Sequence, residues 1–175
     1  MEKYSVNLFE VKKRLFVLGD PDLEKIKNSE IKILVTPFSP LDENNIDIPK
    51  EKYYTSIIDA INNYNNPLII LEDYNLDRII IESLNKKTNS PRIFIQSSKE
   101  KGPYYYKNKN ELEKIVENIN PKKICIGGAF LSPEEKKNPY WLEDTCEDSS
   151  FVGYIYSLFA KKYPTCIDYK LTKVR

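Results

Sequence analysis

Histidine is absent from the 175-residue chain, and this absence restricts the chemistry open to the protein. Histidine is the usual general base near neutral pH and the commonest metal ligand in proteins. Ser-His-Asp, Cys-His and HExxH mechanisms are therefore excluded. Any catalysis must use carboxylates, lysines, tyrosines or cysteines.

Three acidic residues stand at the ends of apolar runs: Asp20 in FVLGDPD, and Glu72 and Asp73 in LIILEDYN. Because hard cations prefer carboxylate oxygens, these residues could converge on Mg²⁺ in a phosphoryl-transfer enzyme. No DxD spacing supports such a site, and Asp73 can equally cap a helix. We therefore predict neither a metal site nor a cofactor.

The phosphate-binding loops GxGxxG and GxxxxGK[ST] are also absent. The pair Gly127-Gly128 in KICIGG is the glycine feature that remains. We interpret it first as a tight turn at a strand end, with close backbone approach to a ligand as the alternative.

Residues 97–109, SSKEKGPYYYKNK, mix lysines with tyrosines, as single-strand nucleic-acid binders do. The segment contains no arginine, and the formal net charge of +1 provides no field that would gather nucleic acid. We predict a solvated loop whose tyrosines fold onto the domain, with nucleic-acid binding as the minor alternative.

Six short apolar runs have the composition of β-strands. They are Arg14 to Gly19, Ile31 to Thr36, Leu68 to Glu72, Arg92 to Gln96, Lys123 to Gly128 and Cys166 to Leu171. The central runs are nearly continuous in apolar residues, as expected of strands buried on both faces, which predicts parallel pairing.

Between these runs, apolar residues recur at helical spacing. The four stripes extend over Tyr54 to Ile61, Leu76 to Leu84, Leu112 to Ile119 and Val152 to Phe159. The alternation predicts a single α/β domain over residues 1–175. Its expected architecture is a three-layer α/β/α sandwich with a mostly parallel sheet of about six strands, Rossmann-like and doubly wound.

In such sheets, ligands bind outside the carboxyl ends of the strands. We therefore expect a small-molecule ligand at that edge. The candidate ligand-binding residues follow the strand runs and are Glu72, Gln96, Ser97, Gly127 and Gly128.

The three cysteines, Cys125, Cys146 and Cys166, have no CxxC spacing, so we predict free thiols, with Cys125 and Cys166 in the core. No apolar run approaches the length of a membrane span, and the start, MEKYSVNLFEVKK, lacks the apolar stretch of a signal peptide. We expect a cytoplasmic protein without a membrane partner. A homo-oligomer is left open.

The stretch from Lys99 to Cys146 carries an ordered set of motifs. A lysine, Lys99 or Lys101, precedes GPYYY, the helix NELEKIVENI, the strand KKICIGGAF and a cysteine in the loop before the helix SSFVGYIYSLFAKKY. This order resembles the isochorismatase-like cysteine hydrolases. In that family a lysine precedes an aromatic-containing loop, the next strand ends at a glycine, and the nucleophilic cysteine opens the following helix.

The resemblance implies Cys146 as nucleophile, Lys101 or Lys99 as the residue that lowers its pKa, and Asp73 or Asp20 as proton acceptor. Such chemistry needs no histidine, because an ammonium and a helix N-terminus stabilise a thiolate. The sequence thus predicts a small-molecule hydrolase that acts on an amide or related bond. The alternative is a non-catalytic α/β ligand-binding or protein-interaction module.

Overall fold

The computed structural model describes residues 15–18, 22–37, 50–72, 90–96, 109–131 and 151–174. The strands are β1 (Leu15–Leu18), β2 (Glu30–Val35), β3 (Leu68–Glu72), β4 (Arg92–Gln96), β5 (Lys123–Leu131) and β6 (Thr165–Val174). The helices are α1 (Leu23–Ile26), α2 (Lys50–Asn63), α5 (Lys109–Ile119) and α7 (Phe151–Phe159). All six apolar runs thus contain strands, and β5 and β6 continue beyond their predicted ends.

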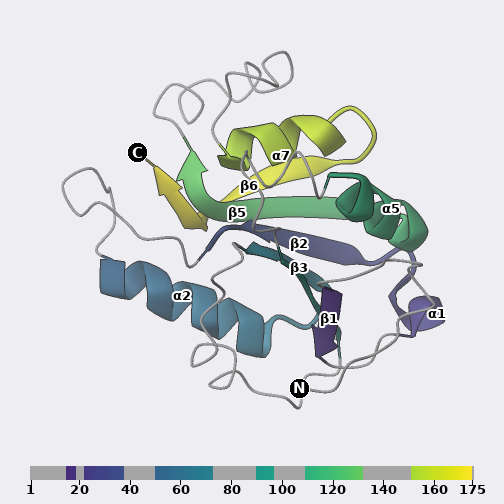
Figure 1. Cartoon of the computed structure of the whole chain (residues 1–175), viewed down its shortest axis with the longest axis horizontal. Helices are drawn as coiled ribbons and strands as arrows, with labels where there is room; N and C mark the ends of the chain where they lie inside the picture. The colour runs from purple at the N-terminus through teal and green to yellow at the C-terminus, as the bar shows by residue number, and fades with distance from the viewer. Residues whose placement is uncertain are drawn as a thin grey trace.

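The described strands form one sheet in the order β1-β4-β3-β2-β5-β6 (Figure 1). All strands from β2 to β6 pair in parallel, which confirms the predicted α/β class and its mostly parallel sheet. β1 instead pairs antiparallel with β4, with Leu15 opposite Ile95 and Leu18 opposite Arg92. The predicted sheet is mostly parallel, and β1 is its antiparallel strand.

Helices cover both faces of the sheet, as Figure 1 shows for α2 on one side and α5 and α7 on the other. The core under α1, α5 and α7 takes the side chains of Ile31, Ile33 and Val35 from β2. The core under α2 takes Leu34 from the same strand. Because β2 is buried on both faces, its sequence is almost continuously apolar. The three-layer arrangement is confirmed for the described residues.

The helical stripes face these cores. In α5 all four predicted positions are buried, and in α7 Tyr156 alone of its four is only partly buried. In α2 the fully buried residues are Tyr53, Ile57 and Ile61, with Tyr54 and Ile58 packed beside them. The predicted stripe from Leu76 to Leu84 lies outside the described residues.

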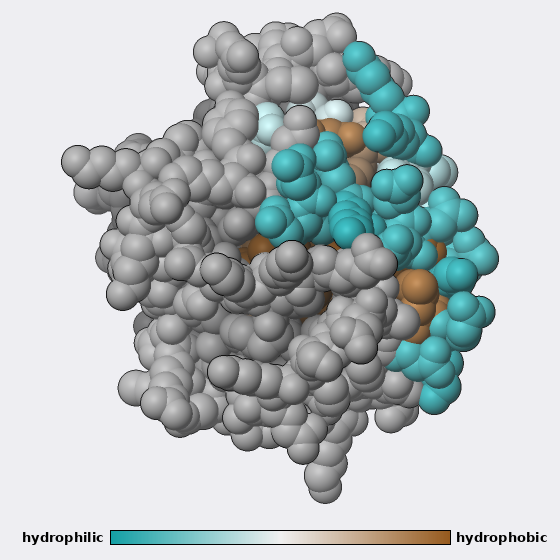
Figure 2. Space-filling view, turned by 45° about the vertical axis from the view of Figure 1, so that its right-hand side comes forward, coloured by the Kyte–Doolittle hydropathy of each residue, from teal (hydrophilic) through white to brown (hydrophobic). Residues whose placement is uncertain are grey.

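The outer surface of the helices is polar. On the side where α1 and α5 lie, Figure 2 shows hydrophilic side chains over most of the described surface, with hydrophobic ones visible in the gaps between them. This distribution is typical of amphipathic helices that bury one face against a sheet.

Arg92, the first residue of β4, joins the end of α2 to the sheet. Its side chain is only 1% exposed. Nε donates to the carbonyl oxygen of Ile61 at 2.5 Å, and the guanidinium also donates to the carbonyl oxygens of Tyr64 and Asn66. Burial lowers the pKa of Arg92 to about 10. The positive charge meets carbonyl groups at the C-terminus of α2, where the helix dipole is negative.

Candidate functional site

The strand order places a topological switch point between β2 and β5. From β2 the chain proceeds outward through β3 to β4, and then returns to the other side of β2 as β5 and β6. Crevices at such reversals, outside the carboxyl ends of the strands, are the usual ligand sites of open α/β sheets. The carboxyl ends of β2 and β5 are therefore the place where the fold favours a ligand.

Backbone register aligns several predicted ligand-binding positions along this edge. Glu72 at the end of β3 is the partner of Gln96 at the end of β4. One residue before the end of β3, Leu71 pairs with Val35 of β2, and Val35 pairs on its other side with Gly128 of β5. The ends of β4, β3 and β2 and the glycine pair of β5 thus follow one another across the sheet.

The other predicted site residues lie outside the described part of the chain, so their roles stay predictions. They are Asp20, Asp73, Ser97, Lys99, Lys101 and Cys146. For Glu72 and Gln96 only the backbone is described. β1 runs antiparallel to β4 and ends at Leu18, beside the first residue of β4, so β1 points toward the amino edge of the parallel strands.

Gly127 and Gly128 lie within β5 and not at a turn after it, which corrects the predicted strand end. Gly128 has φ +122°, and a Cβ there would overlap the carbonyl oxygen of Val35 and lie 2.6 Å from its amide nitrogen. A Cβ on Gly127 would lie 2.9 Å from the carbonyl oxygen of Leu171 in β6. Close packing against β2 and β6 therefore explains both glycines.

Thr36 closes the end of β2 at the switch point. It is 2% exposed and has φ +41°, an uncommon backbone conformation for a β-branched residue. Its amide donates to the carbonyl oxygen of Leu71 at 2.6 Å, and Oγ1 donates to that of Ala129 at 2.6 Å. These bonds hold the chain in its turn and tie the ends of β3, β2 and β5 together.

Lys173, near the end of β6, places a positive charge in the interior beside this edge. It is the partner of Ala129 in β5, has no exposed surface, and its Nζ lies 5.1 Å from the centre of the Tyr53 ring. Buried lysines are rare because desolvation is costly. The sequence interpretation missed Lys173, which stands just beyond the run predicted as the last strand.

A second site lies on the face of the sheet that α2 covers. It is a hollow of about 320 Å³ between the C-terminal half of α2, the start of β2 and the middle of β6. Its lining residues are Lys32, Ser56, Asp59, Ala60, Asn63, Tyr64, Asp168, Lys170 and Leu171. We call this hollow the α2 pocket.

An ion pair forms one wall of the α2 pocket. Lys32 Nζ donates to Asp168 Oδ2 at 2.8 Å, and the two side chains are 21% and 20% exposed. The same ammonium lies 4.7 Å from the centre of the Tyr64 ring, which is cation–π distance. Burial, followed by the charges of Glu30 and Asp168, raises the pKa of Tyr64, while Asn66 and Arg92 oppose the shift.

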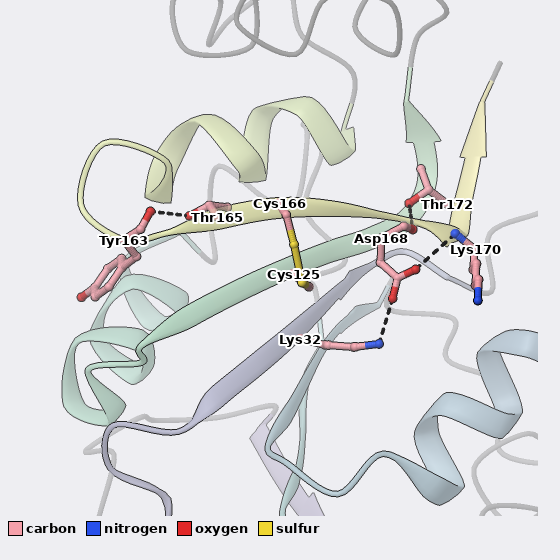
Figure 3. Close-up of a disulfide and its surroundings, with 8 residues drawn as sticks. All are labelled: Lys32, Cys125, Tyr163, Thr165, Cys166, Asp168, Lys170 and Thr172. Atoms are coloured by element: carbon pink, nitrogen blue, oxygen red, sulfur yellow. Dashed lines mark hydrogen bonds and ion pairs between the residues drawn. A yellow bond between two sulfur atoms is a disulfide. The ribbon is translucent and has the colours of Figure 1, made fainter.

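An irregularity in β6 shapes this wall. Ile167 pairs with Ile126, but the next paired residue, Thr172, is already opposite Gly128, so four residues of β6 bulge out against Gly127 alone. Two bonds hold the bulge: Lys170 N donates to Asp168 Oδ1 at 3.2 Å, and Thr172 Oγ1 donates to the Asp168 carbonyl at 2.6 Å. The bulge turns Asp168 and Lys170 toward the pocket, as Figure 3 shows.

Cys125 and Cys166 form a disulfide that joins β5 to β6 beside this ion pair (Figure 3). Their Cα atoms are 4.8 Å apart and are partners in the sheet register. The prediction of free thiols is therefore wrong for these two cysteines. They are also half-buried, not fully in the core as predicted. Cys146 lies outside the described residues.

The sequence feature that could have indicated the α2 pocket is a charged residue inside each of two apolar strands. Lys32 breaks IKILVT, and Asp168 breaks CIDYKL at a position that should face the same side as Cys166. A charge inside an otherwise apolar strand needs a partner of opposite sign, and these two charges are such partners. The pocket lies on one face of the sheet, between Lys32 near the start of β2 and the bulge of β6, whereas the sequence pointed to the carboxyl ends of the strands.

Within the described ranges, no group of three or more acidic or cysteine side chains comes together that could hold a metal ion. The same part of the chain contains no helix that is both long and apolar enough to cross a membrane. Comparison of the chain with protein-family models, with curated proteins and with solved structures finds no match.

Proposed function

We propose that the protein is a small-molecule hydrolase of the isochorismatase-like type, with Cys146 as nucleophile at the carboxyl edge of the sheet. The observation that carries the proposal is the switch point between β2 and β5. β5 leads directly into the segment that contains Cys146, and the ends of β3 and β4 lead into those that contain Asp73, Lys99 and Lys101.

Chain length supports a meeting of these groups. Asp73 directly follows the end of β3, and Lys99 is three residues beyond the end of β4. β3 and β4 are neighbours in the sheet, and their last residues are register partners. Since a residue spans at most about 3.6 Å, Lys99 lies within roughly 11 Å of Gln96. Cys146 precedes the first residue of α7 by five positions, so it lies within about 18 Å of that helix start.

The chemistry is a nucleophilic substitution at a carbonyl carbon. The Cys146 thiolate forms a bond to that carbon, the bond to the leaving group breaks, and the leaving group takes up a proton. Water then hydrolyses the thioester and regenerates the thiol. A neighbouring ammonium, from Lys99 or Lys101, lowers the pKa of the thiol. The direction of β1 favours Asp73 over Asp20 as proton acceptor.

The disulfide makes the first test selective. In unreduced protein Cys125 and Cys166 are blocked, so alkylation by iodoacetamide reports on Cys146. We expect its rate to follow a pKa below the ordinary thiol value of about 8.5, and Lys101→Met or Lys99→Met to raise that pKa. A panel of small amides and esters should be hydrolysed by wild type and not by Cys146→Ala, with Cys146→Ser as the isosteric control.

The same experiments can also support two other functions, a binding module or a phosphoryl-transfer enzyme. A thiol of ordinary reactivity, together with ligand binding that survives Cys146→Ala, would favour the non-catalytic binding or interaction module. Activity that requires added Mg²⁺ and is lost in Asp73→Asn but kept in Cys146→Ala would favour phosphoryl transfer. Either result would overturn the cysteine mechanism.

The proposed partner is a small molecule, and the near-neutral charge argues against nucleic acid. A cytoplasmic location belongs to the same proposal. Stable disulfides are rare in that compartment, so the redox state of Cys125 and Cys166 in protein isolated under thiol-blocking conditions tests it.

A further inference from the structure

Opposite charges face each other across the α2 pocket. Lys32 and Lys170 project from the sheet wall, and Asp59 projects from α2. With Asp168, the lining contains two lysines and two aspartates. Figure 3 shows the Lys170 side chain extending toward α2, away from Asp168, to which only its backbone amide is bonded. The pocket is therefore neutral as a whole but strongly polarised.

Several of these groups retain bonding capacity. The Lys32 ammonium has three donors and gives one to Asp168. Asp59 accepts one bond, from Asn63 Nδ2 at 2.8 Å, which leaves its second oxygen available. Within the described residues, no carboxylate forms an ion pair with Lys170. Ser56 donates to the Lys52 carbonyl at 3.0 Å and can still accept.

The geometry points to the α2 pocket as a binding site for a small zwitterion of the free amino acid class. The ligand carboxylate would lie against Lys32 and Lys170, and its ammonium against Asp59. Ala60 and Leu171 supply apolar surface for a short side chain. Charge-assisted bonds of this kind are about twice as strong as neutral ones, so few contacts can orient a small ligand.

Other ligand classes fit the charges less well. A simple anion would gain Lys32 and Lys170 but would face the carboxylates of Asp59 and Asp168. A simple cation would meet the converse repulsion from the lysines. A sugar usually stacks on an aromatic face, and the Lys32 ammonium already lies over one face of Tyr64. A ligand with both charges meets a partner on each wall.

This site is separate from the proposed hydrolase site. Lys32 places it near the start of β2, and none of its lining residues belongs to the carboxyl-edge set, although Leu171 packs against Gly127. The inference therefore does not depend on Cys146, and Cys146→Ala should leave binding in the α2 pocket unchanged.

The test is titration calorimetry of the full chain with a panel of free amino acids, using propionate, propylamine, inorganic phosphate and glucose as matched probes. At least one amino acid should bind with submillimolar affinity, and each probe that lacks one of the two charges should bind at least about tenfold more weakly. Asp59→Asn and Lys170→Met, which alter exposed positions, should each weaken amino acid binding by about tenfold or more.

Lys122→Met, at an exposed position outside the pocket, is the control and should bind as wild type does. Circular dichroism of each variant distinguishes lost binding from lost folding. Binding of phosphate or propionate as tight as that of any amino acid would overturn the proposal. So would the absence of saturable amino acid binding in the millimolar range, or unchanged binding in folded Asp59→Asn and Lys170→Met.

Discussion

Lys32 and Asp168 are 136 residues apart in the chain, yet Lys32 Nζ and Asp168 Oδ2 are 2.8 Å apart in the fold. β2 and β6 are not neighbours in the sheet, since β5 lies between them. The contact spans β5 because the bulge of β6 turns Asp168 back across the face. This pair joins both sides of the switch point on the face covered by α2.

Lys32→Met should destabilise the protein by about 1–3 kcal/mol, because it leaves the mostly buried Asp168 carboxylate without its cation. Replacing both residues, as in Lys32→Met with Asp168→Leu, should recover part of this loss, since no charge is then left unpaired. Urea denaturation of the single and double variants measures the coupling. Additive losses would show that the two head groups do not interact in solution.

Gly128→Ala should cost about 3 kcal/mol or more, because it combines a positive φ with overlap of the Val35 backbone. Gly127→Ala is the matched comparison in the same strand. Its Cβ would press on Leu171 without positive φ, so we expect a smaller loss of about 1–3 kcal/mol. Thermal unfolding ranks the two, and equal stability of Gly128→Ala and wild type would contradict the described packing of β5 on β2.

Titration of thiols in the denatured, unreduced protein should detect one cysteine, and reduction should raise the number to three. The sequence separation of the bridge is 41 residues, and closing such a loop is worth roughly 4 kcal/mol in the chain-entropy model. Cys125→Ser with Cys166→Ser should therefore unfold at lower urea concentration. Three reactive thiols before reduction would show that no bridge forms.

The stability of the protein should fall as pH rises above 10, in part through Tyr64. Burial raises its folded pKa above the ordinary value of 10.0, so the native state holds the phenol proton longer than the unfolded state does. The contribution is complete below pH 10 and is lost as pH rises through the folded pKa. Tyr64→Phe should make the decline in unfolding free energy shallower. Tyr169→Phe, at a 43% exposed position, is the control.

Arg92→Lys should destabilise the fold by about 2–4 kcal/mol despite retaining the charge. A single ammonium cannot reproduce the guanidinium bonds to the carbonyl groups of Ile61, Tyr64 and Asn66, and buried acceptors would be left unpaired. Urea denaturation measures the unfolding free energy of this variant, with the surface variant Lys122→Met as the control. An Arg92→Lys variant as stable as that control would show that the carbonyl network contributes little.

The sequence predicted the fold class because strand and helix periodicities are local. Leu68–Glu72 and Arg92–Gln96 are strands over the predicted residues, and the α5 stripe is buried as expected. The direction of β1 was not predictable in this way, since an apolar run has the same composition whether it pairs parallel or antiparallel. The carboxyl-edge candidates depend on the same local logic, and most of them lie outside the described residues.

The sequence by itself determined the six strand segments and the helices α2, α5 and α7, and its lack of histidine limited the chemistry. Tertiary structure alone decided that Cys125 bonds to Cys166, that Gly127 and Gly128 serve strand packing, and that Lys32 meets Asp168. The physical reason is that each of these contacts joins residues far apart in the chain. Their proximity depends on strand order and on the bulge in β6, and neither leaves a periodic trace in the sequence.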